Sequence, residues 1–358
     1  MATVVLAGGG TAGHVEPALA VARQWKISHP EDRLIFLGTS SGLETTLVPA
    51  ANFELHLIPR VRISRRPSAS WLNIPFDLIS AVLASKKVIK MADVVIGFGG
   101  YVSAPAYIAA QISGVPIVIH EANAKPGWAN RLGAAFSEHL AVAHPVDSGK
   151  FEHALLAGLP LRSDVAKAFN DSQPDWSAAR RAAKLRLGFP ADAPLIFIMG
   201  GSQGSVAINK VIESSVEMFN KQGLSVLHSV GKLNALPQAK GGYKPVAYVD
   251  AMADAYLAAD LIIGRSGAVT CSEFRALGRY ALFVPLPIGN GEQFVNAASL
   301  VADNRAEVIS QKQFTADFLN SHIAGLLAKS AAAPLGGNGA DLHAAEKIVA
   351  LAEFAMKP

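Results

Sequence analysis

The chain has 358 residues and a formal net charge of +4, with 51% hydrophobic and 17% charged residues. This composition can fill two hydrophobic cores and excludes a disordered chain, which combines low hydrophobicity with high net charge. The single cysteine, Cys271, excludes an intrachain disulfide and a cysteine-rich zinc site, so we expect a reducing compartment, the cytosol.

Short apolar runs alternate with longer helical patterns along the whole chain, which predicts parallel sheets built from βαβ units. The first half contains the predicted strands 3–7, 33–37, 55–58, 93–97, 116–120, 140–143 and 154–157. The second half contains the predicted strands 195–199, 225–229, 246–249, 261–264, 281–284 and 306–309. The sequence therefore predicts an α/β protein with two Rossmann-like, doubly wound parallel sheets.

The sheet pattern breaks near Gly158–Arg162, where a polar and then helical stretch begins. We predict an amino-terminal domain over residues 1–161 and a carboxyl-terminal domain over 162–340. Residues 331–339 contain a proline and several glycines and predict a loop. The last segment, 341–358, predicts a helix that can pack back on the amino-terminal domain.

A basic and aromatic segment follows the third predicted strand. Residues 60–90 contain seven basic residues and one acidic residue, a balance of +6. Cations beside apolar side chains hold proteins on anionic lipid surfaces, and a solvated loop before an ordinary amphipathic helix is the alternative. No apolar run approaches the roughly 20 residues that span a bilayer, so we expect peripheral contact at the cytoplasmic face. No nucleic-acid-binding motif occurs, so no nucleic-acid partner is expected. The proposed membrane residues are Arg60, Arg62, Arg65, Arg66, Trp71 and Phe76.

Four glycine loops each follow a predicted strand and precede a helical pattern, at 8–14, 97–101, 200–204 and 264–268. Backbone N–H groups and the helix dipole make such a loop a site for anions. One loop alone is equally well explained as a tight turn without a ligand. Four loops at the carboxyl ends of two sheets suit a reaction between two phosphorylated partners better than a single cofactor.

Two motifs that are missing from the sequence reduce the number of possible cofactors and mechanisms. A nicotinamide-binding domain would end its second strand with an acidic residue, whereas this strand ends in Phe36-Leu37-Gly38-Thr39-Ser40. The sequence contains no Asp-x-Asp triplet, so we expect no metal, and loop amides would stabilise a leaving diphosphate. Glu273, in the helix that the fourth loop starts, can accept both hydroxyls of a ribose while the amides of Ser266, Gly267 and Ala268 hold the diphosphate. The alternative is an acidic residue that only complements the helix dipole.

These motifs resemble those of one bacterial family, the MurG-type glycosyltransferases, which add N-acetylglucosamine to lipid I, the undecaprenyl-diphosphate-linked muramyl pentapeptide of peptidoglycan synthesis. The resemblance covers nearly the whole chain through residues 9–15, 97–105, 120–123, 161–162, 200–204, 265–273 and 292–296. It implies the GT-B fold, in which two Rossmann-like domains face a cleft. It also implies UDP-N-acetylglucosamine as donor, bound mainly by the carboxyl-terminal half, inversion at the anomeric carbon, and no cofactor.

The resemblance also implies roles for individual residues. The donor shell from the carboxyl-terminal half is Arg162, Ser202, Gln203, Val249, Ala268, Val269, Thr270, Cys271, Ser272, Glu273 and Gln293. Thr11, Ala12, Gly13 and Asn123 would reach the donor from the amino-terminal half, and Gly99, Gly100, Tyr101 and His120 would bind the acceptor. The chain departs from the family at Ala12, where glycine is usual and only a negative φ is tolerated. It also departs at Ile288 and Glu292, which predicts rearranged donor contacts.

An inverting transfer needs a base that takes the proton of the acceptor hydroxyl. His14 is the first candidate because it stands where the first glycine loop enters its helix, although it could instead only bind a phosphate or hydroxyl. Glu121 is the second candidate, although a carboxylate after a buried strand is more readily explained as ordering loop amides. Two other functions share this architecture: a UDP-sugar 2-epimerase and a non-catalytic nucleotide-binding module.

Overall fold

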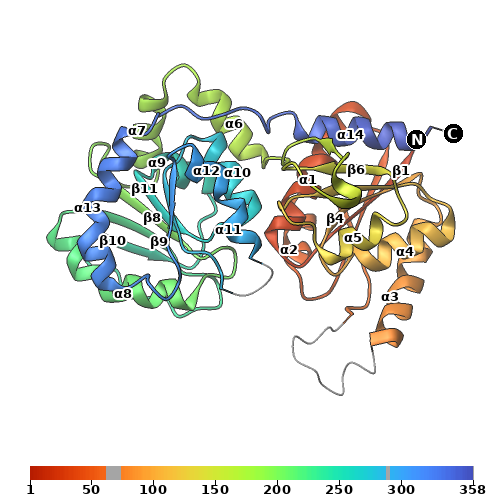
Figure 1. Cartoon of the computed structure of the whole chain (residues 1–358), viewed down its shortest axis with the longest axis horizontal. Coiled ribbons are helices and arrows are strands. Elements are labelled where there is room, and N and C mark those ends of the chain that lie inside the picture. Colours follow the sequence, from red (N-terminus) through yellow and green to blue (C-terminus); the bar gives the residue numbers. More distant parts are fainter. Residues whose placement is uncertain (62–73, 288–290, 358) are drawn as a thin grey trace. The chain divides into compact units, whose positions relative to one another are not determined.

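The computed structural model describes residues 1–61, 74–287 and 291–357. The chain forms two compact units. Unit 1 comprises Met1–Arg162 and Ala340–Pro358, and unit 2 comprises Ser163–Gly339. In each unit, a parallel sheet is packed between helices (Figure 1).

Unit 1 is built on a seven-stranded parallel sheet with the order β3-β2-β1-β4-β5-β6-β7. Its central strands are almost unbroken apolar runs, as strands covered on both faces require. Val4, Val5 and Leu6 of β1, for example, are at most 1% exposed. The strands are β1 Thr3–Gly8, β2 Arg33–Gly38, β3 Glu54–Leu57, β4 Val94–Gly99, β5 Ile117–Glu121, β6 His139–Val142 and β7 Leu155–Leu156.

Helices cover both faces of this sheet. Residues of α3 and α4 pack with Val5 and Ala7 on one face, while residues of α1 and α14 pack with Val4 and Leu6 on the other. Helix α14 lies near the carboxyl end of the chain and contributes Ile348 to the core of unit 1. The helices are α1 Ala12–Ser28, α2 Glu44–Ala50, α3 Ile74–Ile89, α4 Ser103–Ser113, α5 Trp128–Gly133 and α14 Ala344–Ala355, with a 3₁₀ turn at Gly149–Phe151.

Unit 2 has a six-stranded parallel sheet with the order β10-β9-β8-β11-β12-β13. Residues of α8 and α13 pack on one face around Ile196 and Ile198, and the other face carries the stacked rings of Phe274 and Phe283. The strands are β8 Leu195–Met199, β9 Ser225–Ser229, β10 Tyr243–Val246, β11 Leu261–Gly264, β12 Ala281–Phe283 and β13 Ala306–Val308. The helices are α6 Ser163–Ser172, α7 Trp176–Arg186, α8 Val206–Lys221, α9 Met252–Ala258, α10 Ala268–Ala276, α11 Glu292–Asn296, α12 Ala298–Ala302 and α13 Ala316–Ala332.

The predicted α/β class with two parallel sheets is confirmed, and every predicted strand overlaps a strand of the structure. One position is wrong: the strand predicted at 246–249 lies at Tyr243–Val246. Pro245 lies in this strand and cannot donate to a sheet. However, β10 is an edge strand, and edge positions tolerate proline. Val249 therefore follows the strand instead of ending it.

Each unit contains a fully buried histidine that makes stability sensitive to acid. Burial is the main cause that lowers the pKa of both His120 and His228 from 6.5 to about 4. Between pH 6.5 and 4 the unfolded chain therefore binds more protons than the folded chain. We expect each histidine to reduce the free energy of unfolding by up to about 1.4 kcal/mol per pH unit as the pH falls through this window.

Urea unfolding at pH 7.5 and pH 5 measures this loss. His228→Gln should make the stability of unit 2 less dependent on pH. Equal unfolding midpoints at both pH values in the unchanged protein would show that the buried imidazoles do not govern acid sensitivity.

Candidate active site

The four glycine loops lie in two pairs, one pair in each unit. In unit 1 they follow β1 and β4, and in unit 2 they follow β8 and β11; the strands within each pair are hydrogen-bonded neighbours. In both sheets the direction in which successive strands are added reverses between these two strands. Open α/β sheets bind ligands at this switch point, beside the carboxyl ends of the strands. Each unit therefore presents one candidate ligand site made of two glycine loops.

The first loop of unit 1 carries Thr11 and His14 into α1. Ala12 is the first residue of this helix and is not among the residues with positive φ, so an alanine is tolerated there. Nδ1 of His14 lies 3.2 Å from the Gly9 carbonyl oxygen and 3.3 Å from Thr11 Oγ1. A carbonyl only accepts, so this contact assigns the ring hydrogen to Nδ1. Nε2 then keeps the lone pair that a base requires.

One amide of the first loop is already occupied. Glu44, the first residue of α2, is fully buried, and its Oε2 accepts a hydrogen bond from Gly10 N at 2.8 Å. Its Oε1 accepts from the amide of Thr39 at 2.8 Å and from the hydroxyl of Thr39 at 3.2 Å. We expected this loop to offer its amides to a phosphate. For Gly10 that prediction is wrong, because an internal carboxylate holds the N–H.

The second loop of unit 1 packs against the first, backbone to backbone. Gly99 and Gly100 have φ of +91° and +83°, and a Cβ on Gly100 would lie 2.6 Å from the Gly9 carbonyl oxygen. Only glycine fits there. Tyr101 follows with 39% of its surface exposed, and the guanidinium carbon of Arg60 lies 6.0 Å from its ring centre. The loop therefore presents an aromatic ring and a cation beside its glycines.

Glu121, at the end of β5, orders the loop that follows it. Its Oε1 accepts from Asn123 N at 2.9 Å and from Asn123 Nδ2 at 3.1 Å. Its Oε2 accepts from Gly127 N and Asn130 Nδ2, both at 2.9 Å. The hydroxyl of buried Tyr107 donates to Asn130 Oδ1 at 2.8 Å. Four donors occupy the lone pairs that a base would use, so this geometry favours loop ordering over proton transfer.

His120 lies in the core and not on the surface of the site. It is fully buried, and its Nε2 lies 2.8 Å from the Gly158 carbonyl oxygen. Its ring centre is 5.9 Å from that of Phe98. Because Nε2 contacts the Gly158 carbonyl oxygen, we propose that His120 supports the loops after β5 and β7.

In unit 2, the loop after β8 packs tightly against the end of β9. Gly204 has a φ of +74°, and a Cβ on it would lie 1.9 Å from the Val230 carbonyl oxygen. Ser202 is half-buried and Gln203 is exposed in this loop. Helix α8 begins directly afterwards, and Ser205 Oγ caps it by accepting from Ile208 N at 3.4 Å. The positive end of a helix of 16 residues therefore lies at this loop.

Arg265 braces the loops of unit 2, and it was missing from our predicted site residues. Its Nη1 donates to the carbonyl oxygens of Val284 at 2.7 Å and Pro285 at 3.0 Å. Its Nη2 donates to Ser205 Oγ at 2.8 Å and to Gln311 Oε1 at 2.7 Å. One guanidinium therefore ties the loop after β11 to the start of α8 and to the segment after β12. All four of these acceptors are neutral.

Helix α10 carries the predicted donor residues 268–273. Cys271, Ser272 and Glu273 are at most 2% exposed, whereas Val269 and Thr270 are half-buried. Burial raises the pKa of the Cys271 thiol to about 12, so this cysteine is not a nucleophile. The buried hydroxyl of Ser266, just before the helix, has no hydrogen-bond partner in the part of the chain that the structure describes.

The remaining predicted residues are placed as follows. Gln293 Oε1 accepts from Leu286 N at 2.9 Å, which fixes this side chain to the segment after β12. Arg162 belongs to unit 1, and Glu292 begins α11. Ile288 lies outside the described residues, as do Arg62, Arg65, Arg66 and Trp71. Among the described residues, no cluster of His, Cys, Asp and Glu could hold a metal ion.

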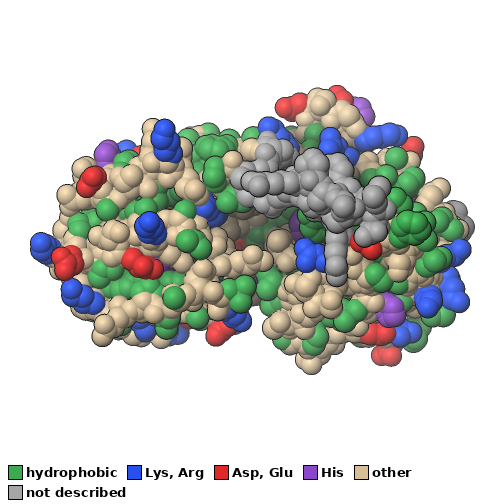
Figure 2. All heavy atoms as spheres, turned by 90° about the horizontal axis from the view of Figure 1, so that it is seen from below, with side chains coloured by type: hydrophobic (Ala, Val, Ile, Leu, Met, Phe, Trp, Pro, Cys, Tyr) green, Lys and Arg blue, Asp and Glu red, His purple; other side chains and the backbone are tan. Residues whose placement is uncertain are grey.

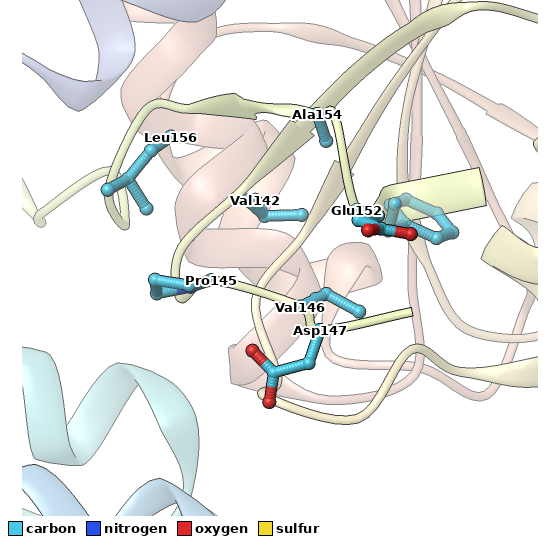
Figure 3. A pocket seen from close by; sticks show the side chains of 8 residues that line it. Val142, Pro145, Val146, Asp147, Glu152, Ala154 and Leu156 are labelled. Atoms are coloured by element: carbon cyan, nitrogen blue, oxygen red, sulfur yellow. The ribbon is translucent and has the colours of Figure 1, made fainter. Parts of the chain in front are cut away.

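A separate hollow of about 440 Å³ lies beside β6 and β7 (Figure 3). None of the glycine-loop residues lines it. We therefore place the candidate active site at the switch points and not in this hollow. Its lining residues are Val142, Pro145, Val146, Asp147, Phe151, Glu152, Ala154 and Leu156.

Two parallel sheets with two glycine loops at each switch point define a protein of the GT-B class. Residues 4–142 match the model of the glycosyltransferase family 28 N-terminal domain, and residues 195–348 match that of the family 28 C-terminal domain. The chain belongs to glycosyltransferase family 28.

Individual relatives agree with this assignment. The chain is 46% identical over 318 residues to a protein of Corynebacterium glutamicum strain R, covering 88% of this chain and 86% of that protein. It is 41% identical over 367 residues to a protein of Thermobifida fusca, covering 98% and 94%. Both are named UDP-N-acetylglucosamine–N-acetylmuramyl-(pentapeptide) pyrophosphoryl-undecaprenol N-acetylglucosamine transferase.

Solved structures support the fold. The crystal structure of Acinetobacter baumannii MurG matches with a TM-score of 0.69 and 27% identity over 98% of this chain and 100% of that chain. A UDP-GlcNAc 2-epimerase from Neisseria meningitidis matches with a TM-score of 0.58 and 14% identity over 98% of both chains, a likeness of fold alone. The predicted GT-B fold and glycosyltransferase class are confirmed.

Proposed function

We propose that this protein transfers N-acetylglucosamine from UDP-N-acetylglucosamine to the C4 hydroxyl of the muramyl residue of lipid I, with inversion at the sugar's anomeric carbon. The product is lipid II, a precursor of peptidoglycan. The observation that carries this proposal is the similarity, above 40% identity over at least 88% of the chain, to transferases named for this donor and acceptor. The paired glycine loops of both units support it, because donor and acceptor each contain a diphosphate.

The chemistry is one in-line displacement. The acceptor hydroxyl oxygen forms a bond to the anomeric carbon as the bond from that carbon to the UDP oxygen breaks, and the electron pair leaves with UDP. The hydroxyl proton passes to His14 Nε2, because Nδ1, the other ring nitrogen, contacts the Gly9 carbonyl oxygen as the donor. Loop amides and the amino end of α8 stabilise the charge that develops on the leaving diphosphate.

We assign the donor to unit 2. The diphosphate would lie against the loops after β8 and β11, where Ser202, Gln203 and the unpartnered hydroxyl of Ser266 are available. Glu273 would accept the ribose hydroxyls, and the backbone beside Val249 would face the uracil. In unit 1, Gly99, Gly100 and Tyr101 would receive the acceptor.

Incubation with the donor alone separates transfer from epimerisation. We expect the purified protein to leave UDP-N-acetylglucosamine unchanged in proton NMR spectra, and to release UDP only when a soluble lipid I analogue is added. A 2-epimerase would produce the C2 epimer without an acceptor. Formation of that epimer from the donor alone would overturn the transferase proposal.

The proposed acceptor is a membrane lipid, and α3 has an exposed apolar face that can bind the membrane surface. Phe76, Ile79 and Leu83 on this helix are 73%, 57% and 57% exposed. They are spaced three and four residues apart, so they share one face of the helix. Figure 2 shows hydrophobic side chains gathered over α3. The last turn of the helix adds the cations Lys86 and Lys87. No helix in the described ranges is both long and apolar enough to cross a membrane. We propose that α3 holds the protein peripherally on the anionic cytoplasmic face.

Replacing Phe76, Ile79 and Leu83 together by serine should weaken binding to anionic vesicles, measured by sedimentation, by about 1,000-fold or more. The reason is that each of the three exposed apolar side chains contributes roughly 1.5 kcal/mol by burial in lipid. Ile27→Ser is the matched control, since Ile27 is 75% exposed on α1, on the other face of the sheet. Equal vesicle binding by the triple variant and this control would contradict the role of α3.

A further inference from the structure

The peptide group between Gly9 and Gly10 lies between two functional side chains. Its carbonyl oxygen is 3.2 Å from Nδ1 of His14. Its N–H donates to Oε2 of Glu44 at 2.8 Å. Both contacts use opposite ends of one planar amide. A continuous chain of hydrogen bonds therefore runs from the imidazole through one peptide group to a buried carboxylate.

The surroundings are shaped for the side chain of Glu44. A Cβ on Gly9 would lie 2.9 Å from its Oε1, one on Gly38 would lie 2.5 Å from its Cγ, and one on Gly42 would overlap its carboxylate. Three glycines thus leave the space that the side chain fills. The contacts described above to its two oxygens come from N–H and O–H donors, which is the environment that an ionised carboxylate requires.

We infer that Glu44 is a positioning residue that holds His14 in the Nδ1–H tautomer through the Gly9–Gly10 peptide group. This inference rests on the proposed function, in which His14 Nε2 is the base. A carboxylate that accepts from the N–H of an amide polarises that amide and makes its carbonyl oxygen a better acceptor. The Gly9 carbonyl then binds Nδ1–H more strongly, and the lone pair stays on Nε2.

The arrangement is a histidine and carboxylate pair with one peptide group inserted. In serine hydrolases an aspartate contacts Nδ1 directly, fixes the tautomer and stabilises the imidazolium that forms. Here the glycine loop does both through its backbone. Gly10 has a φ of +91°, a conformation that glycine adopts readily and other residues rarely do, and it aims this N–H at Glu44. The Gly10 amide of this glycine loop therefore binds Glu44 and helps to orient the base, so it is not available to an anion.

The first test needs no mutation. Nitrogen-15 NMR of the full chain with labelled histidine distinguishes the two neutral tautomers, and the His14 signal is identified among ten histidines by its loss in His14→Gln. We expect His14 to be mainly the Nδ1–H tautomer near neutral pH, although an imidazole in water prefers Nε2–H. A predominantly Nε2–H signal would overturn the inference.

The second test removes the charge at nearly constant shape. In Glu44→Gln, the single amide oxygen cannot serve both Gly10 N–H and the donors of Thr39. We expect the Nδ1–H fraction of His14 to fall and kcat to drop about 10- to 100-fold, by analogy with the loss seen when the hydrogen-bond partner of a metal-binding histidine is removed. The KM for the donor should stay near that of the unchanged protein, because the donor loops of unit 2 are untouched.

Glu54→Gln is the matched control for charge, since Glu54 is an exposed carboxylate of the same unit that pairs with Arg33. It should change neither the tautomer nor kcat. If Glu44→Gln keeps the tautomer and the kcat of this control, Glu44 does not act on His14. The tautomer is measured without substrates. The inference about Glu44 can therefore be refuted independently of the proposed transfer activity.

Discussion

Replacing His14 with alanine should lower kcat for sugar transfer about 100- to 10,000-fold, the contribution typical of a general base. The affinity for UDP-N-acetylglucosamine should change little, because the residues that we assign to the donor lie mainly in unit 2. The physical reason is the loss of His14 Nε2, the nitrogen to which we assign the transfer of the acceptor proton. Steady-state kinetics with a lipid I analogue gives kcat, and isothermal titration calorimetry gives the donor affinity.

His29→Ala serves as the control for His14, since His29 caps the opposite end of the same helix and pairs with Glu353 at 2.7 Å. It should retain kcat. Turnover by His14→Ala at the rate of the unchanged protein would exclude His14 as the base and would return attention to Glu121.

Replacing Arg265 with methionine should weaken UDP binding more than about tenfold, equal to 1.4 kcal/mol or more. It should also lower the free energy of unfolding of unit 2 by about 2–4 kcal/mol, because four acceptors lose a charged donor in a buried site. Methionine keeps much of the volume without donating. Calorimetry with UDP and urea unfolding measure the two effects.

Arg305→Met separates stability from binding. Arg305 also donates to backbone carbonyls of unit 2, those of Pro334 and Gly336, at 2.9 Å each. These carbonyls lie in the segment before the chain returns to unit 1. We expect lower stability with unchanged UDP affinity. If Arg265→Met binds UDP as tightly as this control does, UDP binding by the loops of unit 2 does not depend on the hydrogen bonds of Arg265.

The sequence predicted the sheets and the four glycine loops because both signals are local. An apolar run bounded by glycine identifies a buried parallel strand without knowledge of its neighbours. The order of the strands in the sheet depends on contacts between distant segments, and this order brings the loops together in pairs. For example, Gly8 of β1 aligns with Gly99 of β4 although 90 residues separate them. The sequence predicts two loops in each half, but only the structure shows that the two loops of each half follow hydrogen-bonded neighbouring strands.

The bracing residues escaped prediction for the same reason. Glu44 contacts Gly10 across 34 residues, and Arg265 contacts Ser205 across 60. In sequence, Glu44 resembles an ordinary acidic residue in the first turn of a helix. Its burial and its contact with a glycine loop arise only when β2 is placed beside β1. Long-range polar contacts carry no periodic pattern that could reveal them.

His120 illustrates a limit of the resemblance, which implied an acceptor contact for it. In the structure its side chain lies in the core and contacts Gly158. Side chains alternate between the faces of a strand, so neighbouring residues at a strand end point in opposite directions. Glu121 accordingly serves the loop while His120 serves the core.

The proposed reaction is tested most directly by determining which atom of the acceptor receives the sugar. The protein is incubated with UDP-N-acetylglucosamine labelled in the sugar and a lipid I analogue, and the product is analysed by mass spectrometry and NMR. We expect the label on the C4 hydroxyl of the muramyl residue through a β linkage, and no product from an acceptor that lacks this hydroxyl. Label elsewhere, an α linkage, or no transfer by the active, folded protein would contradict the proposed reaction.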